Sequence, residues 1–304
     1  MNKYNLKNFT LIIFIIFIII LFLQCNLYIE NFVIKPWKYD EHLVNNIDAT
    51  NRINIWEKTV NKFGLKEALN IFPMTYILPR DIKKCVLDNN VNFILKTLRG
   101  FQRKGVILAN NKNDIIKNMF NYDIAQVYIK NPLLINKFKF DVRTFIVIDC
   151  NYGIYLYKNS YNVYTKDHFN LNSMDRDTKI NQVFTEDTHY DINNLPRKFD
   201  DLVKYNLNVD NIYNKLAAKL KKVFISIDDV CNYDDIYNSK SKYNIYGLDF
   251  EVLDNLEPII IEINNGPSLN FDEEWKQNIT NSLEEHIINK TYNNNNFIKI
   301  MKVL

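Results

Sequence analysis

Two apolar runs near the C-terminal end of the chain each carry an acidic residue, and this pair constrains the fold more than any other feature. Asp249 lies in the run YGLDFEVL, and Glu262 and Asn264 lie in the run PIIIEINNGPSL. The apolar residues predict two strands, over 245–253 and 258–263, joined by a turn at Asp-Asn. Side chains alternate along a strand, so Glu262 and Asn264 point to the same face.

These three side chains suggest an all-oxygen metal site. Apolar residues precede both acids, and burying a carboxylate without a partner is costly. Carboxylate and amide oxygens are the ligands that Mg²⁺ prefers in proteins. We therefore expect Asp249, Glu262 and Asn264 to bind Mg²⁺. The alternative is that each acid is simply solvated at a strand end.

Alternating charges mark a further strand, around residues 140–149. The segment KFDVR puts Lys139, Asp141 and Arg143 on one face and its two apolar residues on the other. Three ionised groups that face one cleft suit a polyanionic ligand. The same pattern is also typical of a solvent-facing edge strand with an internal ion pair.

Lys96 ends a short apolar strand and precedes the basic loop TLRGFQRKG, which contains Arg103 and Lys104. A lysine in that position can reach a phosphate. The glycines of the loop have the spacing of a P-loop, but Val106 and Ile107 stand where that motif needs Lys and Ser or Thr. The sequence therefore indicates a basic loop between two strands that is not a P-loop.

The remaining apolar spacing predicts a mixture of helices and strands. Helices are expected over 52–72, 113–121, 212–227 and 273–288, and strands over 91–95, 105–108, 124–129, 140–149 and 154–157. This mixture indicates an α+β or α/β fold.

Charge and cysteine spacing exclude several classes of protein. The chain has 38 Lys and Arg against 35 Asp and Glu, and this net charge of +3 excludes a strongly basic nucleic-acid binder. We expect no nucleic-acid partner. Cys25, Cys85, Cys150 and Cys231 show no CxxC spacing, which argues against a zinc knuckle and against a disulfide framework.

The N-terminus carries a separate apolar segment. Residues 9–23 read FTLIIFIIFIIILFL, and the uncharged stretch continues to residue 29. A stretch over 9–29 can cross a membrane, so we expect a membrane anchor; a cleaved signal segment and a buried helix are the alternatives. Basic residues on both flanks leave the side of the membrane open. Sequons at Asn278 and Asn289 fit a lumenal location and are also expected by chance in a chain so rich in asparagine.

Taken together, these residues resemble the tubulin tyrosine ligase-like family of ATP-grasp enzymes. The resemblance runs, in the family's order, through FPMTYILPRD, FILK, AQVYIKNPLLINKFKFDVRTFIVI, IYLYK and YGLDFEVLDNLEPIIIEINNGPSL. It implies an α+β, ATP-grasp fold in which two α+β lobes clamp ATP and Mg²⁺, preceded here by an N-terminal hydrophobic helix. The divisions that follow are a membrane anchor or signal segment over 1–30, an N-terminal lobe and lead-in over 31–92, a central lobe over 93–130, and a C-terminal lobe with the metal site over 131–304.

The resemblance also implies a role for each site residue. The phosphates would contact Lys96, Arg103 and Lys104, and the nucleotide would also contact Lys139 and Asp141. The adenine would be held by the backbone of a hinge made of Gln126, Val127, Tyr128 and Ile129. The catalytic residues would be Lys139 and Arg143, with Arg143 on the carboxylate of an incoming amino acid. Mg²⁺ would be bound by Asp249, Glu262 and Asn264.

The implied reaction is ATP-dependent ligation. A carboxylate takes the γ-phosphoryl group to give an acylphosphate, and an amine then displaces phosphate. The implied partners are a free amino acid and an acidic protein tail such as that of tubulin. The loop sequence QRKG and Tyr164 depart from the family's pattern, which favours a second hypothesis: a catalytically inactive binding module that keeps the fold and docks on an acidic tail.

Overall fold

The computed structural model describes residues 52–88, 92–98, 105–173, 175–181, 195–227, 230–231 and 243–302. The N-terminal hydrophobic segment and the loop residues Arg103 and Lys104 lie outside these ranges. Within them, no helix combines the length and the apolar character that a membrane crossing requires. The described part of the chain is α+β, with two antiparallel sheets.

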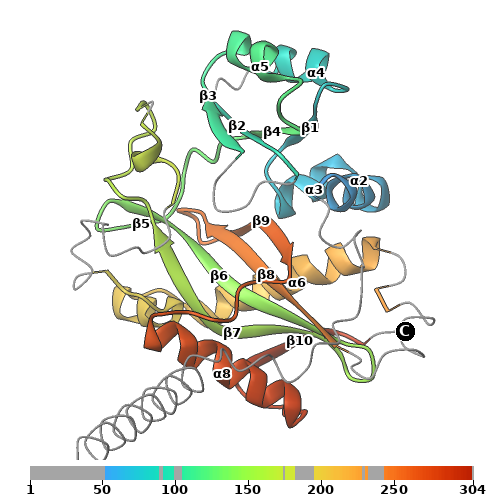
Figure 1. Cartoon of the computed structure of the whole chain (residues 1–304), viewed down its shortest axis with the longest axis vertical. Helices are drawn as coiled ribbons and strands as arrows, with labels where there is room; N and C mark the ends of the chain where they lie inside the picture. Colours follow the sequence, from blue (N-terminus) through green and yellow to red (C-terminus); the bar gives the residue numbers. More distant parts are fainter. Residues whose placement is uncertain are drawn as a thin grey trace, which may run out of the picture. The chain divides into compact units, whose positions relative to one another are not determined.

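The smaller sheet has four strands in the order β1-β4-β2-β3, all antiparallel (Figure 1). Its strands are β1 (Thr75–Ile77), β2 (Phe93–Lys96), β3 (Val106–Ala109) and β4 (Ile124–Val127). Phe93, Leu95 and Ala125 face a core that also includes residues of α4 (Ile82–Leu87) and α5 (Lys112–Asn118). Alternation along the strands therefore turns Lys96 and Gln126 to the opposite face.

The larger sheet follows the order β10-β7-β6-β8-β9, and β5 pairs with β6 beside this path (Figure 1). Its strands are β5 (Leu134–Ile135), β6 (Phe138–Asp149), β7 (Gly153–Tyr164), β8 (Tyr243–Val252), β9 (Pro258–Asn265) and β10 (Phe297–Met301). Strand β6 lies at its centre, between β7 and β8. Two hairpins, β6–β7 and β8–β9, thus meet along the β6–β8 pairing.

The two faces of this sheet have different coverings. Phe140, Val142 and Ile146 pack in one core with residues of α6 (Val209–Ser226). On the other face α8 (Glu274–Ile288) packs against β7, where the hydroxyl of Tyr157 donates to the Ile279 carbonyl at 3.4 Å. Tyr157 lies opposite Phe145 in the β6–β7 register. Helix α8 therefore covers the part of this face that lies beyond Arg143, toward the C-terminal end of β6.

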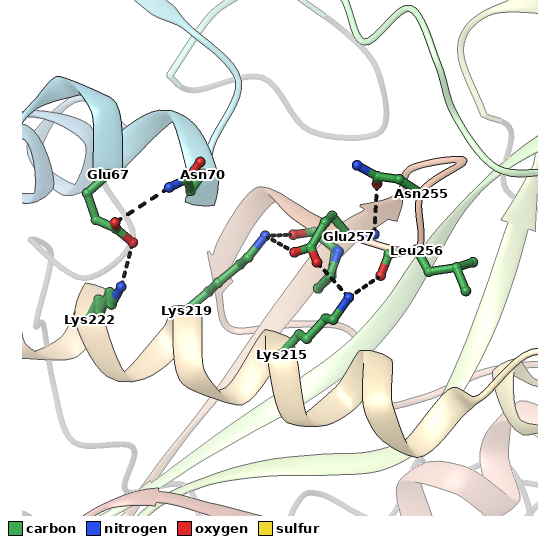
Figure 2. A network of polar contacts seen from close by, with 9 residues as sticks. Glu67, Asn70, Lys215, Lys219, Lys222, Asn255, Leu256 and Glu257 are labelled. Carbon is green, nitrogen blue, oxygen red and sulfur yellow. Dashed lines mark hydrogen bonds and ion pairs between the residues drawn. The ribbon is translucent and has the colours of Figure 1, made fainter.

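Lysines along α6 hold the β8–β9 turn in place (Figure 2). Both Lys215 and Lys219 pair with Glu257, at 2.6 Å and 3.2 Å, and Lys219 also donates to the Pro258 carbonyl at 2.7 Å. One turn further, Lys222 pairs with Glu67 of α3 at 2.5 Å. The contacts of Lys215 and Lys219 fix the start of β9, the strand that carries two of the expected metal ligands.

The single helix expected over 52–72 is wrong, because the structure has two. Helices α2 (Arg52–Phe63) and α3 (Leu65–Ile71) are separated by Gly64, whose φ is +82°. That conformation is open to glycine at little cost and ends a helix. The structure also has the 3-10 helices η2 (Arg176–Thr178) and η4 (Phe199–Tyr205), which the apolar spacing does not predict.

The argument from cysteine spacing against disulfides is wrong for one pair. Cys150 and Cys231 form a disulfide with their Cα atoms 5.9 Å apart and 81 residues apart in the sequence. The spacing of cysteines in the sequence cannot show which segments lie close together in space. Here the end of β6 lies beside the chain that follows α6. Cys85 is a buried thiol.

Candidate functional site

The register of three neighbouring strands gathers the predicted charged residues on one face. Arg143 of β6 lies opposite Asp249 of β8, and Asp249 lies opposite Glu262 of β9. Asp141 lies opposite Glu251 in the same β6–β8 pairing. Because cross-strand partners point to the same side of a sheet, all five side chains share a face.

Arg143 and Asp249 form a two-pronged pair. The Arg143 Nη2 atom donates to Asp249 Oδ2 at 2.7 Å, and Nε donates to the other carboxylate oxygen. Burial alone would lower the pKa of the guanidinium, but the Asp249 charge outweighs it and raises that pKa above its usual range. The side-chain amide nitrogen of Asn264 lies 3.5 Å from Asp249 Oδ2. Two of the three expected metal ligands are therefore adjacent.

Glu262, the third expected ligand, is paired with an arginine that sequence reasoning missed. Arg52, the first residue of α2, contacts Glu262 Oε1 through Nη2. Its Nη1 donates to the Thr97 carbonyl at 3.0 Å, directly after Lys96. In the sequence Arg52 reads as the polar first residue of an amphipathic helix, and no local signal links it to a strand 210 residues away.

Lys139 is buried between two carboxylates. Its Nζ lies 2.8 Å from Glu251 Oε2 and 3.2 Å from Asp141 Oδ1. Burial would lower the pKa of this ammonium, but Asp141 and Glu251 outweigh it and raise the pKa. The Lys139 charge is thus held by two neighbours on the site's face.

Glu251 is a second residue that sequence reasoning missed. Burial raises the pKa of its carboxyl, and the positive charge of Lys139 opposes that rise. Among the described residues, its Oε1 atom is buried and accepts no hydrogen bond. The sequence did contain a signal for Glu251. It follows Asp249 by two positions in a predicted strand, and residues two apart on a strand lie on the same face.

Lys96 projects from the smaller sheet toward the same cluster. Its Nζ donates to Gln126 Oε1 at 2.8 Å, and Gln126 Nε2 donates to Thr75 Oγ1 at 3.1 Å. Burial lowers the pKa of Lys96 to about 8, and the positive charge of Arg52 acts in the same direction. Lys96 is therefore within electrostatic reach of the arginine that holds Glu262.

The expected adenine hinge already uses part of its backbone within the fold. The N–H of Val127 donates to Met74 at 2.8 Å, and that of Tyr128 donates to Asn92 at 3.0 Å. The hydroxyl of Tyr128 donates to the Lys179 carbonyl at 3.0 Å. A backbone contact with a base would have to use the other groups of the segment, such as those of Ile129.

Gly247 lets the loop after β9 approach the charged face closely. A Cβ atom at this position would lie 3.1 Å from Cβ of Pro267 and 3.6 Å from Nη1 of Arg143. Gly247 also lies opposite Asn264 in the register. The loop and the Arg143 side chain thus pack together over a residue that has no side chain.

The oxygen donors fit Mg²⁺ in kind, although they include two carboxylates rather than three. No cluster of three or more His, Cys, Asp and Glu suited to a metal occurs in the described residues. Asp249, Glu262 and Asn264 offer carboxylate and amide oxygens on adjacent strands, which suits a hard cation. Each carboxylate now faces a guanidinium, Asp249 that of Arg143 and Glu262 that of Arg52.

A cavity of about 590 Å³ lies elsewhere, at the N-terminal end of α6. It is lined by residues that include Lys158, Asp200 and Asp210, and by none of the predicted site residues. Lys158 is paired with Asp210 there at 2.9 Å. The case for a site on the β6–β8–β9 face therefore rests on the converging charged groups, not on this cavity.

Comparisons with known proteins identify the family. The model of the Tubulin-tyrosine ligase family matches residues 28–299. Tubulin glycylase 3C of Tetrahymena thermophila is 25% identical over 250 residues, which cover 76% of this chain and 23% of that protein. Tubulin polyglutamylase ttll6 of Danio rerio is 23% identical over 242 residues, covering 70% and 30%. Probable tubulin polyglutamylase TTLL2 of Homo sapiens is 21% identical over 299 residues, covering 87% and 48%. The chain thus spans less than half the length of each of these relatives.

Proposed function

The chain belongs to the tubulin-tyrosine ligase family, and from that premise we propose that it is a protein-modifying amino-acid ligase. The reaction would use ATP and Mg²⁺ and would join a free amino acid to a protein carboxylate. The observation that carries the proposal is the cross-strand alignment of Arg143, Asp249 and Glu262, with Lys139 and Lys96 beside them.

We propose that the two sheets are the two lobes of an ATP-grasp fold. The smaller sheet would be the central lobe assigned to 93–130, extended by β1 from the lead-in over 31–92. The larger sheet would be the C-terminal lobe over 131–304. Lys96 comes from the first and Lys139 from the second, so a triphosphate between them would contact both lobes.

Each predicted residue takes one part of the chemistry. ATP would supply the γ-phosphoryl group that converts the acceptor carboxylate into an acylphosphate; the amine of the amino acid then attacks the acyl carbon, an amide forms and phosphate leaves. The phosphates would be bound by Lys96, Lys139 and the loop residues Arg103 and Lys104. Asp141 would contact the nucleotide, the segment 126–129 would hold adenine, and Asp249, Glu262 and Asn264 would bind Mg²⁺.

The protein's own side chains act chiefly by fixed charge. Lys139 keeps its proton because two carboxylates flank it, so it offers a permanent positive charge to a transferring phosphoryl group. Arg143 has the planar fork that matches a carboxylate, and exchanging Asp249 for the amino acid's carboxylate would orient that substrate. Holding the two reactants together supplies much of the remaining acceleration.

The names of the relatives support an acidic protein tail, such as that of tubulin, as the acceptor. The test is to incubate the full chain and Mg·ATP with tubulin and acidic peptides, adding Tyr, Glu or Gly separately, and to measure peptide mass. We expect an ATP-dependent gain of one or more amino-acid residues. Asp249→Asn and Glu262→Gln should abolish the gain, whereas Asp201→Asn on η4 should not.

A non-catalytic module that docks on an acidic tail is the competing function. Tyr164, one of its motivations, is fully buried and donates its hydroxyl to the Pro196 carbonyl at 2.9 Å, which is a packing role. The same experiment discriminates the two functions. Peptide binding without any mass gain, across all three amino acids, would favour the module.

We also propose that the chain is membrane-anchored through residues 9–29. Tubulin and ATP are cytosolic, so modification of a tubulin tail requires the folded part on the cytosolic side, where the Cys150–Cys231 disulfide would be unusual because disulfides are rare in the reducing cytosol. A lumenal folded part would suit this disulfide and the exposed sequon residues Asn278 and Asn289, and it would require a lumenal acidic acceptor. Protease protection of the folded part in sealed membranes discriminates the two sides.

A further inference from the structure

We propose that Tyr161 is a further binding residue for the amino-acid substrate, and that its hydroxyl donates a hydrogen bond to the substrate carboxylate beside the Arg143 fork. The two side chains would together form one carboxylate receptor. This inference rests on the proposed function, in which Arg143 binds that carboxylate. It adds a residue that the pattern of charges along the strands does not single out, because Tyr161 carries no charge.

The strand register places Tyr161 directly beside Arg143. Tyr161 of β7 lies opposite Arg143 of β6, and Arg143 in turn lies opposite Asp249 of β8. Cross-strand partners point to the same side of a sheet, with their Cβ atoms about 5 Å apart. Tyr161 is only 6% exposed. It is therefore built into the charged face, on the side of Arg143 that lies away from Asp249.

Three side chains hold the ring of Tyr161 in place. Phe271, which precedes α8, and Trp275 of α8 each meet the ring edge to face, with centroids 6.1 Å and 5.9 Å away. The Nζ atom of Lys276 lies 5.6 Å from the centroid of the Tyr161 ring, and Lys276 is itself paired with Glu273 at 2.6 Å. The direction of the hydroxyl is thus set before any ligand binds, which reduces the entropy lost on binding.

The hydroxyl of Tyr161 has no hydrogen-bond partner among the residues that the structure describes. Two other tyrosines of β7 differ in this respect, because Tyr157 donates to the Ile279 carbonyl and Tyr164 to that of Pro196. The Tyr161 oxygen is also not one of the enclosed polar atoms that lack a partner, so it reaches the open side of the cluster. Burial raises the pKa of Tyr161 to about 12, so the hydroxyl keeps its proton and can donate it.

A substrate carboxylate has room for both groups. Its two oxygens offer about four lone-pair positions, and the fork of Arg143 would occupy two of them. A phenolic O–H can take a third position, and hydrogen bonds to an ionised acceptor are stronger than those between neutral groups. The charge of Arg143 opposes the rise in the pKa of Tyr161, which shows that the two groups are within electrostatic reach of each other. The pair should therefore favour a free α-carboxylate over an uncharged α-amide.

The experiment compares the full chain with Tyr161→Phe, which removes the hydroxyl and keeps the ring. Incorporation of the amino acid that the peptide-mass experiment identifies is measured by steady-state kinetics, and so is incorporation of its α-amide analogue. For Tyr161→Phe we expect the KM for the amino acid to rise at least about tenfold, because a hydrogen bond to a charged group is lost. The kcat and the KM for ATP should stay within about twofold of the wild type, and so should the KM for the α-amide.

Tyr157→Phe is the matched control, because it removes a hydroxyl of the same strand whose partner is the Ile279 carbonyl. It should leave the KM for the amino acid unchanged. Thermal unfolding of both variants is measured alongside the kinetics.

The selective change in one KM is what separates binding from packing. A merely structural Tyr161 would shift the KM for ATP, kcat and thermal stability together with the KM for the amino acid, and that result overturns the proposal. A rise of equal size for the α-amide also overturns it. An active wild type whose KM for the amino acid matches that of Tyr161→Phe refutes the role of Tyr161 alone. A wild type that adds no amino acid to any peptide refutes the proposed function itself.

Discussion

At the scale of single residues, Lys96 links burial to a dependence on pH. Burial lowers the pKa of its ammonium to about 8, so the group loses its proton between about pH 7 and pH 9. We expect Mg·ATP to bind more weakly as the pH rises from about 7 to about 9, because the protonated form is the one that attracts phosphate. Calorimetry at the two pH values measures this, and Lys96→Arg should remove the dependence. Equal wild-type affinity at both values would contradict the assignment.

Gly247 carries a second prediction at this scale. Gly247→Ala puts a methyl group 3.1 Å from Pro267, and we expect a loss of about 1–3 kcal/mol in the free energy of unfolding together with weaker Mg·ATP binding. Gly64→Ala is the matched control, because its added Cβ meets no atom within 4 Å and the cost there comes from φ +82° alone. Urea unfolding and calorimetry should show a stability loss in both variants but a binding defect in Gly247→Ala alone.

Much of the charged face could be predicted residue by residue, because strand alternation is a local rule. The spacing of Lys139, Asp141 and Arg143 put them on one side, and the structure has them there. Arg52 could not be found in this way, since its contact with Glu262 depends on how a helix packs against a distant strand. The functions assigned to these residues remain predictions.

At the scale of elements, the lysines of α6 that hold the β8–β9 turn give a prediction about stability. Glu257→Ala removes the partner of both Lys215 and Lys219 (Figure 2). These pairs are partly exposed, so we expect a loss of about 1 kcal/mol in the free energy of unfolding, measured by urea denaturation. Asp201→Ala deletes an exposed pair with Lys204 and should change stability by much less. Equal losses in the two variants would show that the turn is not anchored in this way.

Elements were easiest to predict where one periodicity continued without interruption. The helix expected over 212–227 and the strand expected over 140–149 match α6 and β6 closely. Gly64 was overlooked inside the expected helix over 52–72, because apolar spacing continues across it while the backbone does not. Strand β10 was missed, because its five residues follow a run of asparagines and give little alternation.

At the scale of the whole molecule, the disulfide gives a prediction about covalent structure. A non-reducing proteolytic digest of the full chain, blocked first with a thiol-alkylating reagent in denaturant, should contain one peptide pair joined through Cys150 and Cys231. Cys85 should carry the alkyl group, because it is a thiol in the structure. Recovery of Cys150 and Cys231 as alkylated peptides would contradict both the bond and a lumenal position of the folded part.

Sheet order was the least predictable feature, because it joins segments that are distant in the chain. No pattern in the sequence states that β6 pairs with β8 rather than standing at an edge. That pairing nevertheless determines which carboxylate Arg143 contacts, because Asp249 lies 106 residues away in the sequence. The family resemblance was sufficient to predict the α+β class. The contacts among the charged residues follow from the strand register, which the structure shows.

The β6–β8 seam has a consequence for the protein during its synthesis. A nascent chain that has left the ribosome only as far as α6 contains Lys139, Asp141 and Arg143 but none of the carboxylates of β8 and β9. Strand β6 would then present an open edge, and such edges recruit other chains. A premature stop codon before β8 should therefore yield an aggregating product with no residual chemistry.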